Sequence, residues 1–374
     1  MSGAHSILAP SSAARRVQCS ASTRAEAAYP QAEDSPEAAA GTAAHWGLAE
    51  MLEGRLVDVG QVAPNGMFLT EEMIEAIDLV HDDVTAELAP YGMRPSQGMV
   101  EQRVAITRIH AESWGTPDYA IWPSPTHLLV YDFKFGHRVV EVFENWQLIE
   151  YVTGLLDERG IVDDQFVTVT VKIAQPRAFH RNGPIRSWTF RASDIRAHIN
   201  LATVAAREAL GPNAQARVGP ECRDCRARHA CETLQRAAMT ACDMAGAPQP
   251  FDLPPAALAL EYRTLRRYAA LLDARITGLE EQAFSHIKAG KSLPGLRVEH
   301  GAGREQWTVP DKVVIQIGRA IGVNVANPAK AMTPKQAVKA GLPDAVLAGI
   351  VTTPRGAAKL VEDDGARARR VFAA

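Results

Sequence analysis

Three features are scarce in this sequence of 374 residues: long apolar runs, an excess of basic charge, and cysteine outside one short cluster. No apolar run is long enough to cross a bilayer, and the first ten residues lack a basic segment followed by an apolar core. We therefore expect no membrane span and no secretion, and a cytoplasmic protein. The net charge of -3 argues against a protein that coats nucleic acid non-specifically, but it is compatible with a local basic groove.

The composition is that of a globular protein, with 47% hydrophobic and 22% charged residues. A chain of this length can form two modest domains. The Pro-rich segment 247–255 predicts a boundary between an N-terminal domain at 1–245 and a mainly helical C-terminal region at 250–374. A long helix at 258–283 with one apolar seam predicts packing on the protein itself or on a second copy in a homo-oligomer. From residue 291 onward 13 Lys and Arg stand against 7 Asp and Glu, a balance that permits phosphate contacts.

The most informative stretch is 115–151. Two apolar runs, one after Asp118 and one before Lys134, are separated by a Pro-bearing turn, which predicts a β-hairpin. Because side chains alternate across a strand, Asp132 and Lys134 should share one face while Phe133 points to the other. The hairpin should bring Asp118 back toward this face. Two carboxylates beside a lysine are typical of a divalent-metal phosphodiesterase, in which carboxylate oxygens bind the cation and the lysine orients water or offsets charge.

Other segments predict how this hairpin is packed. Alternating runs at 166–174 and 186–191 predict two more strands. Helical patterns at 71–80 and 193–210 flank them in the sequence. Together these patterns predict an α/β fold, with a mixed sheet flanked by helices.

Three short motifs appear in a fixed order: Gly115-Thr-Pro-Asp118, Asp132-Phe-Lys134 and Gln147-Leu-Ile-Glu-Tyr151. In this order and spacing they resemble the RecB-like branch of the PD-(D/E)XK nuclease superfamily, whose pattern is G-x-x-D, (D/E)-x-K and Q-x-x-x-Y. Each motif alone is weak, since Asp-x-Lys on a strand is usually a solvated face and a Gln/Tyr pair one turn apart is usually helix surface. Their combination is far more specific, and the resemblance implies a restriction-endonuclease-like sheet.

The resemblance also implies a role for each matched residue. Asp118 and Asp132 would bind Mg²⁺ or Mn²⁺, with the carbonyl of Phe133 as a further ligand. Lys134 would assist the attacking water. Gln147 and Tyr151, from the third motif, would position the phosphate or the lysine.

His45 lies on a predicted helix among alanines, in Gly41-Thr-Ala-Ala-His45. A lone histidine on an apolar helix is more often a satisfied core residue than a ligand. The RecB-like resemblance reverses that preference, because a histidine on an N-terminal helix belongs to the metal site of that family. His45 is therefore expected to be a metal ligand.

Three of the five cysteines, Cys222, Cys225 and Cys231, lie within ten positions. In a cytosolic protein such a cluster indicates a metal site more than disulfides. Spacing alone leaves open whether the site holds zinc or an iron–sulfur cluster, with Cys19 as a fourth ligand. Cys242 is treated as a bystander.

This arrangement is similar to the iron–sulfur version of the RecB-like fold found in AddB-type helicase–nucleases and CRISPR-associated RecB-like exonucleases. One N-terminal and three C-terminal cysteines there bind a [4Fe-4S] cluster, which implies Cys19, Cys222, Cys225 and Cys231 as ligands. The overall layout also resembles a family of phage- and prophage-encoded RecB-like proteins, most closely up to the third of the clustered cysteines. The role of the [4Fe-4S] cluster would be structural, and Zn²⁺ is the alternative metal for the site.

These features together predict a metal-dependent DNA exonuclease that acts on single-stranded or duplex ends in phage recombination or end-processing, inside the bacterial host cell. A single-strand annealing protein is a further expected partner. Two other classes compete: a non-catalytic DNA-binding recombination accessory protein on the same fold, and a zinc-stabilised structural protein. The intact set of two aspartates and one lysine argues against a scaffold.

Overall fold

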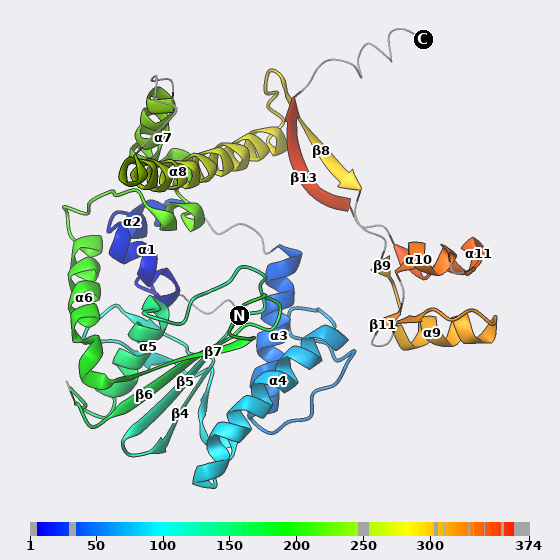
Figure 1. The fold of residues 1–374 in the computed structure, drawn as a ribbon, viewed down its shortest axis with the longest axis horizontal. Coiled ribbons are helices and arrows are strands. Elements are labelled where there is room, and N and C mark those ends of the chain that lie inside the picture. Colours follow the sequence, from blue (N-terminus) through cyan, green and yellow to red (C-terminus); the bar gives the residue numbers. More distant parts are fainter. Residues whose placement is uncertain are drawn as a thin grey trace. The chain divides into compact units, whose positions relative to one another are not determined.

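Figure 1 shows the computed structural model of the chain. It describes residues 6–29, 35–162, 164–245, 254–302, 306–309, 311–327, 330–331, 333–339, 341–352 and 355–362. The chain forms two compact units, Met1–Gly278 and Leu279–Ala374. The boundary expected at 247–255 falls mostly on residues outside the described ranges. The division between the two units lies further along the chain, within the long helix α8 (Pro255–Lys288).

A five-stranded mixed sheet forms the centre of the first unit. The strand order is β1-β4-β5-β6-β7, with β1 (Met99–Val100), β4 (Tyr119–Ser124), β5 (His127–Phe133), β6 (Thr168–Ala174) and β7 (Ile185–Arg191). Only β5 and β6 are parallel. The helix α5 (Trp146–Asp157) connects them, as a parallel pair requires a crossover. The predicted β-hairpin is β4–β5, with Tyr119 opposite Tyr131.

Helices cover both faces of this sheet. On one face Leu129, Tyr131 and Phe133 pack against α3 (Pro36–Leu52) and α4 (Glu71–Leu88). On the other, Leu128 and Val130 pack against α5 and α6 (Arg196–Leu210). Odd and even positions of β5 are thus buried on opposite sides, as strand alternation requires. The predicted fold class, a mixed α/β sheet flanked by helices with a helical C-terminal region, is confirmed.

Capping residues begin the helices that carry candidate site residues. Ser35 accepts a hydrogen bond from the backbone N–H of Ala38 and is followed by proline at the first position of α3. Asn145 accepts from the N–H groups of Gln147 and Leu148 and begins α5. The Asn cap therefore fixes where α5 begins, one residue before Gln147.

The N-terminal segment folds as three short elements, namely a 3₁₀ turn η1 (Pro10–Ser12), α1 (Ala13–Gln18) and α2 (Ser22–Ala27). The sequence at 5–19 predicts a short helix that Pro10 opens and that ends near Cys19. The structure confirms it, since Cys19 is the C-cap of α1. On α1 the Arg16 side chain is fully buried and forms an ion pair with Glu150 of α5, whose side chain is also fully buried. This pair joins the N-terminal segment to α5.

The remaining elements of the first unit are short, apart from α7 and α8. They are η2 (Ala89–Tyr91), η3 (Pro95–Gln97), β2 (Val104–Ala105), β3 (Trp114–Gly115), η4 (Ala192–Ile195), η5 (Pro220–Asp224), η6 (Arg228–Ala230) and α7 (Glu232–Ala245). Strands β2 and β3 form a separate two-stranded antiparallel sheet.

The second unit has a small core of its own around Val314, Val325, Ala337 and Leu342. Its elements are β8 (Leu296–Ala302), β9 (Gln306–Trp307), α9 (Asp311–Ala320), β10 (Ala326–Asn327), β11 (Lys330–Ala331), α10 (Pro334–Lys339), α11 (Asp344–Leu347), β12 (Val351–Thr352) and β13 (Arg355–Glu362). The sequence patterns at 296–300 and 306–310 predict a hairpin between β8 and β9. That prediction is wrong, because β8 pairs with β13 and β9 pairs with β12. Among the described residues, no helix has the length and apolarity of a membrane span.

Candidate functional site

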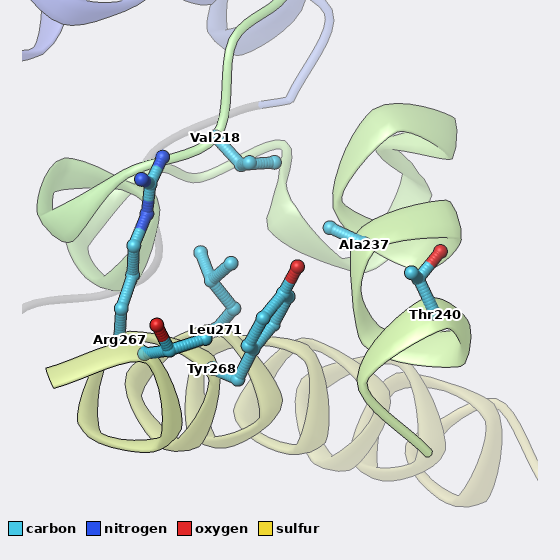
Figure 2. Close-up of a pocket in the computed structure, with 7 residues that line it drawn as sticks. Val218, Ala237, Thr240, Arg267, Tyr268 and Leu271 are labelled. Atoms are coloured by element: carbon cyan, nitrogen blue, oxygen red, sulfur yellow. The ribbon is translucent and has the colours of Figure 1, made fainter. Parts of the chain in front are cut away.

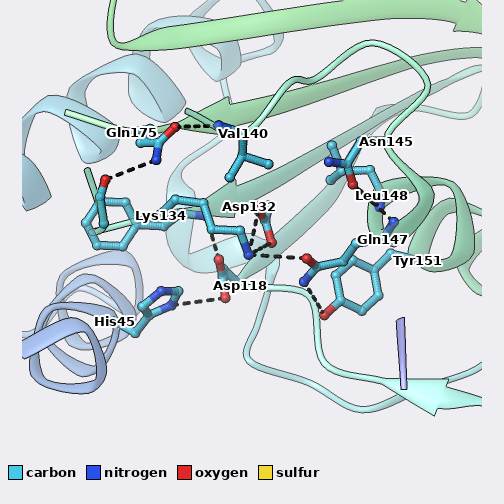
Figure 3. Close-up of polar contacts among 12 residues, drawn as sticks. His45, Asp118, Asp132, Lys134, Val140, Asn145, Gln147, Leu148, Tyr151 and Gln175 are labelled. Carbon is cyan, nitrogen blue, oxygen red and sulfur yellow. Dashed lines mark hydrogen bonds and ion pairs between the residues drawn. The ribbon is translucent and has the colours of Figure 1, made fainter. Parts of the chain in front are cut away.

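The first part of the site lies where β4 begins and β5 ends. Asp118 directly precedes β4, and the antiparallel pairing brings it beside the end of β5, where the backbone N–H of Phe133 donates to Asp118 Oδ2 at 2.5 Å. Nδ1 of His45, from α3, lies 3.2 Å from Asp118 Oδ1. The His45 ring also packs on the Phe133 ring, with centroids 5.2 Å apart. Figure 3 shows the contact of His45 with Asp118.

Glu101 joins this group, and the sequence patterns did not indicate it. It follows β1, which pairs with β4, and its backbone N–H donates to the carbonyl of Asp118 at 3.2 Å. Its Oε1 lies 3.9 Å from His45 Nδ1. The φ angle of Glu101 is 48°, an uncommon conformation for a residue other than glycine, and such outliers cluster at functional sites.

His45, Glu101 and Asp118 each offer one ligand atom, and these three atoms lie within 4.8 Å of one another. Among the residues that the structure describes, no other set of three or more His, Cys, Asp or Glu is this close. Carboxylate oxygens with one imidazole nitrogen suit Mn²⁺ and, with more oxygen donors, Mg²⁺. The donor set therefore fits a divalent cation, and His45, which the apolar helix pattern alone would assign to the core, is one of the three donors.

A second chain of contacts begins at Asp132. Lys134 Nζ lies 3.0 Å from both carboxylate oxygens of Asp132 and 3.2 Å from Gln147 Oε1. Gln147 Nε2 then donates to Tyr151 Oη at 3.1 Å (Figure 3). Asp132 and Lys134 thus share one face, as strand alternation predicts, and of the two partners expected for Gln147, phosphate or lysine, it contacts the lysine.

The structure brings together most of the predicted residues but divides them into two groups. Asp132 belongs to the lysine group and is not one of the three closest metal donors. Its side chain is 3% exposed, whereas that of Lys134 is 28% exposed. The ammonium thus stands between the buried carboxylate and solvent. The carbonyl of Phe133 as a metal ligand stays a prediction.

Burial and like charges shape the protonation of the site. Burial raises the pKa of Asp132, and the neighbouring Asp118 raises it further against the opposing effect of Lys134. Burial alone would lower the pKa of His45, but Asp118 and Glu101 outweigh it and raise that pKa to about 10. The pKa of Asp118 is lowered, because its imidazole and ammonium neighbours outweigh burial. The carboxylates are thus crowded enough that a bound cation would relieve their mutual repulsion.

Gly115 is required by close packing around the site. A Cβ at this position would lie 2.6 Å from Cγ of Pro10 and 2.7 Å from Cε1 of Tyr151. We expect Gly115→Ala to displace Tyr151, to cost about 1–3 kcal/mol in unfolding free energy, and to lower any activity that depends on Gln147. Chemical denaturation measures the first effect. Gly136→Ala is the matched control, since a Cβ there meets nothing within 4 Å; equal losses in both variants would contradict the packing account.

The four candidate cysteines form a second centre on the N-terminal segment and the 215–231 loop. Each sulfur accepts a backbone N–H: Cys19 from Arg217 at 3.4 Å, Cys222 from Gly219 at 3.4 Å, Cys231 from Leu234 at 3.5 Å, and Cys225 from Ala227. Charge on Cys19 or Cys231 would raise the pKa of Cys222, so these sulfurs are near neighbours. Sulfurs that accept N–H bonds are typical of metal-bound thiolates.

Burial raises the pKa of Cys222, and it raises that of Cys225 to about 11. Without a metal these thiols are therefore protonated at neutral pH, and metal binding would release their protons. Among the described residues, His229 belongs to no group of three possible metal ligands. Its ring stacks edge-on against Tyr29, and its Nδ1 contacts the carbonyl of Arg226. Helices α7 and α8 complete this region. A cavity of about 290 Å³ lies between them (Figure 2), lined by Val218, Ala237, Thr240, Thr264, Arg267, Tyr268 and Leu271, none of which belongs to the His45 and Asp118 site.

Residues 5–368 match a family model described as "Protein of unknown function (DUF2800)". The match covers almost the whole chain. The chain belongs to this family. Both centres lie within the matched residues, which include most of each compact unit.

Proposed function

We propose that this protein is a metal-dependent DNA exonuclease of RecB-like PD-(D/E)XK type. The observation that carries the proposal is the convergence of His45, Glu101 and Asp118 next to the pair of Asp132 and Lys134. Five polar side chains from four separate segments meet at the ends of the strands, where β4 begins and β5 ends. A scaffold would gain nothing from burying Asp118 and Asp132 beside each other with Glu101 next to them, because the repulsion of these carboxylates costs stability.

Different residues of the site would have different roles in phosphodiester hydrolysis. His45, Glu101 and Asp118 would hold Mg²⁺ or Mn²⁺, with Asp132 and the Phe133 carbonyl completing its ligands. When bound, the cation supplies a Lewis acid that polarises the phosphate and lowers the pKa of a bound water. Lys134 is held by Asp132 on one side and Gln147 on the other, which aims its ammonium and leaves it partly exposed.

Gln147 and Tyr151 position that lysine. The Gln147 amide donates to the Tyr151 hydroxyl and accepts from Lys134, so its orientation is fixed at both ends. Burial raises the pKa of Tyr151, which keeps its hydroxyl protonated and able to donate to a phosphate oxygen. Lys134 then needs no reorganisation to assist a water or to offset charge on the phosphate.

The topology agrees with the RecB-like resemblance. The parallel pair of β5 and β6, joined by α5, places Asp132 and the Gln147 helix on the same face of the sheet. Residues from all three motifs then lie together at one site. We further propose that the enzyme acts in phage recombination or end-processing in the host cytoplasm. A single-strand annealing protein would be its partner there.

The function is tested with end-labelled single-stranded and double-stranded DNA incubated with Mn²⁺, Mg²⁺ or EDTA. We expect shortening of the labelled strand in Mn²⁺ or Mg²⁺ and none in EDTA. Lys134→Ala should lose cleavage while keeping its fold, as circular dichroism would show. A Lys134→Ala protein that digests DNA at the wild-type rate contradicts the role of the lysine; DNA binding without cleavage would support the accessory-protein alternative instead.

For the cysteine centre we propose a structural [4Fe-4S] cluster held by Cys19, Cys222, Cys225 and Cys231. Tetrahedral Zn²⁺ with Zn–S distances of about 2.3 Å needs sulfurs about 3.8 Å apart. Yet no three of the four described thiols lie within 4.8 Å of one another. The wider spacing supports the larger cluster.

We expect the protein purified without oxygen to be brown, with absorbance near 400 nm and about four iron atoms per chain. Cys222→Ser should lose both the colour and the iron, and it should unfold at a lower temperature than the wild type. Cys242→Ser is the matched control, because Cys242 is not among the proposed ligands. One zinc and no iron in the anaerobic protein would contradict the cluster and favour the zinc alternative.

A further inference from the structure

We propose that Arg103 and Trp114 together bind the nucleic-acid strand as it approaches the metal centre. The inference rests on the proposed nuclease function and assigns the site a substrate contact outside the residues that resemble the RecB-like motifs. The guanidinium carbon of Arg103 lies 3.8 Å from the centroid of the Trp114 ring. Arg103 directly precedes β2, and Trp114 lies on β3.

The small sheet β2–β3 sets the position of the pair. β2 begins three residues after Glu101, and β3 ends three residues before Asp118. The pairing of Ala105 with Trp114 puts Arg103 diagonally across from the indole on the same face. That face is open, since Arg103 and Ala105 are exposed.

The opposite face of the small sheet is anchored next to the site. Val104 is fully buried on that face and packs with the α5 cluster. A Cβ on Gly154 of α5 would lie 2.6 Å from Val104 Cγ1, so helix and strand are in close contact. Gly115, the neighbour of Trp114, packs under Tyr151. The Arg103–Trp114 pair therefore sits on a rigid support that also carries the site residues.

The negative charge of the site explains why a positively charged side chain is useful beside it. A phosphate approaching Glu101, Asp118 and Asp132 meets three carboxylates, and the bound cation offsets only part of that charge. Arg103 has no carboxylate partner among the described residues. A guanidinium stacked on an indole keeps its N–H groups free at the edge, where they can donate to phosphate oxygens. The exposed part of the indole can stack on a base.

The chain contains a matched pair far from the site. Arg159 lies over the Trp122 ring at 4.1 Å. Trp122 is four residues beyond Asp118 on β4, roughly 13 Å along the strand. It has the same stacking chemistry but no neighbouring metal ligands, so Arg159→Gln controls for the loss of one stacked arginine.

The test measures binding of a fluorescent single-stranded oligonucleotide in Ca²⁺, at several salt concentrations, for wild type, Arg103→Gln, Arg103→Lys and Arg159→Gln. We expect Arg103→Gln to raise the Kd about tenfold at low salt, the loss expected for one charge-assisted contact. Its plot of log Kd against log salt should be shallower by about 0.7, the slope expected of one phosphate contact on a single strand. Arg103→Lys should keep the slope, and Arg159→Gln should match the wild type in both.

The outcomes separate this inference from the proposed function. Wild-type binding and cleavage together with an Arg103→Gln protein of unchanged Kd and slope would overturn the inference alone. Equal losses in Arg103→Gln and Arg159→Gln would also overturn it, because they would reflect stacking in general. A wild-type chain that neither binds nor cleaves DNA would overturn the proposed function itself.

Discussion

Asp118→Asn is expected to lower the rate of DNA cleavage on the order of 10³-fold and to weaken Mn²⁺ binding in parallel. Asp118 is the residue that joins the two halves of the centre, since it contacts His45 and accepts the N–H of Phe133. Asparagine keeps the size and an oxygen that can accept this N–H bond. What it removes is the negative charge that a divalent cation requires.

Isothermal titration with Mn²⁺ and single-turnover cleavage measure the two effects separately. Asp157→Asn is the control: Asp157 is a partly buried carboxylate at the end of α5 that pairs with Arg108. That variant should keep Mn²⁺ binding and cleavage. An Asp118→Asn protein with wild-type Mn²⁺ affinity would show that the cation is bound elsewhere.

The largest effect on stability is expected at the buried pair of Arg16 and Glu150. Both side chains are 0% exposed, so removal of one leaves an unpaired group in the interior. We expect Arg16→Met to lower the unfolding free energy by about 3–5 kcal/mol. The double variant Arg16→Met with Glu150→Leu should recover most of that loss. Urea denaturation of the three proteins measures both values, and a double variant no better than the single one contradicts the pairing account.

The same pair predicts a pH dependence. Burial raises the pKa of Glu150 from 4.5 to about 7, against the opposing effect of Arg16. The folded protein therefore holds this proton more tightly than the unfolded chain, and stability from this group is present at low pH and lost as pH rises through 7. Without the Arg16 cation the pKa rises further. Arg16→Met should thus cost more stability at pH 8 than at pH 5; an equal cost at both values would show that Glu150 does not ionise here.

The ion pairs also link the two centres. Arg16–Glu150 joins the helix that ends at Cys19 to the helix that carries Gln147, and Arg138–Asp224 joins the loop after Lys134 to the cysteine loop. The centres are therefore connected through packed side chains rather than by shared ligands. If the proposed cluster forms, we expect its loss to disturb the site through these contacts.

Local patterns were sufficient for the parts of the site that lie within one segment. The β4–β5 hairpin, the common face of Asp132 and Lys134, and the one-turn spacing of Gln147 and Tyr151 all follow from residues less than 40 positions apart. These features depend only on strand alternation and helical period. They could be predicted because nothing outside the segment decides them.

Features that depend on long-range pairing could not be predicted in the same way. Glu101 reaches the site because β1 pairs with β4, and no motif surrounds it in the sequence. Glu150 is an unusual residue before the tyrosine of the third motif, and its partner Arg16 lies 134 positions away in the sequence. The expected β8–β9 hairpin failed for the same reason, since the true partner of β8 begins at Arg355. Hydrophobic patterns show which face of a strand or helix is buried, but they do not show which distant segment pairs or packs with it.

The most direct measurement is cleavage of end-labelled single-stranded and duplex DNA by the purified chain, with Mn²⁺, compared with the same reaction in EDTA. Metal-dependent release of short products from an end, lost in Lys134→Ala, is the result expected if the converged carboxylates, histidine and lysine act on phosphodiesters. Intact DNA of both kinds in every divalent cation supplied, from a folded protein, would contradict the account.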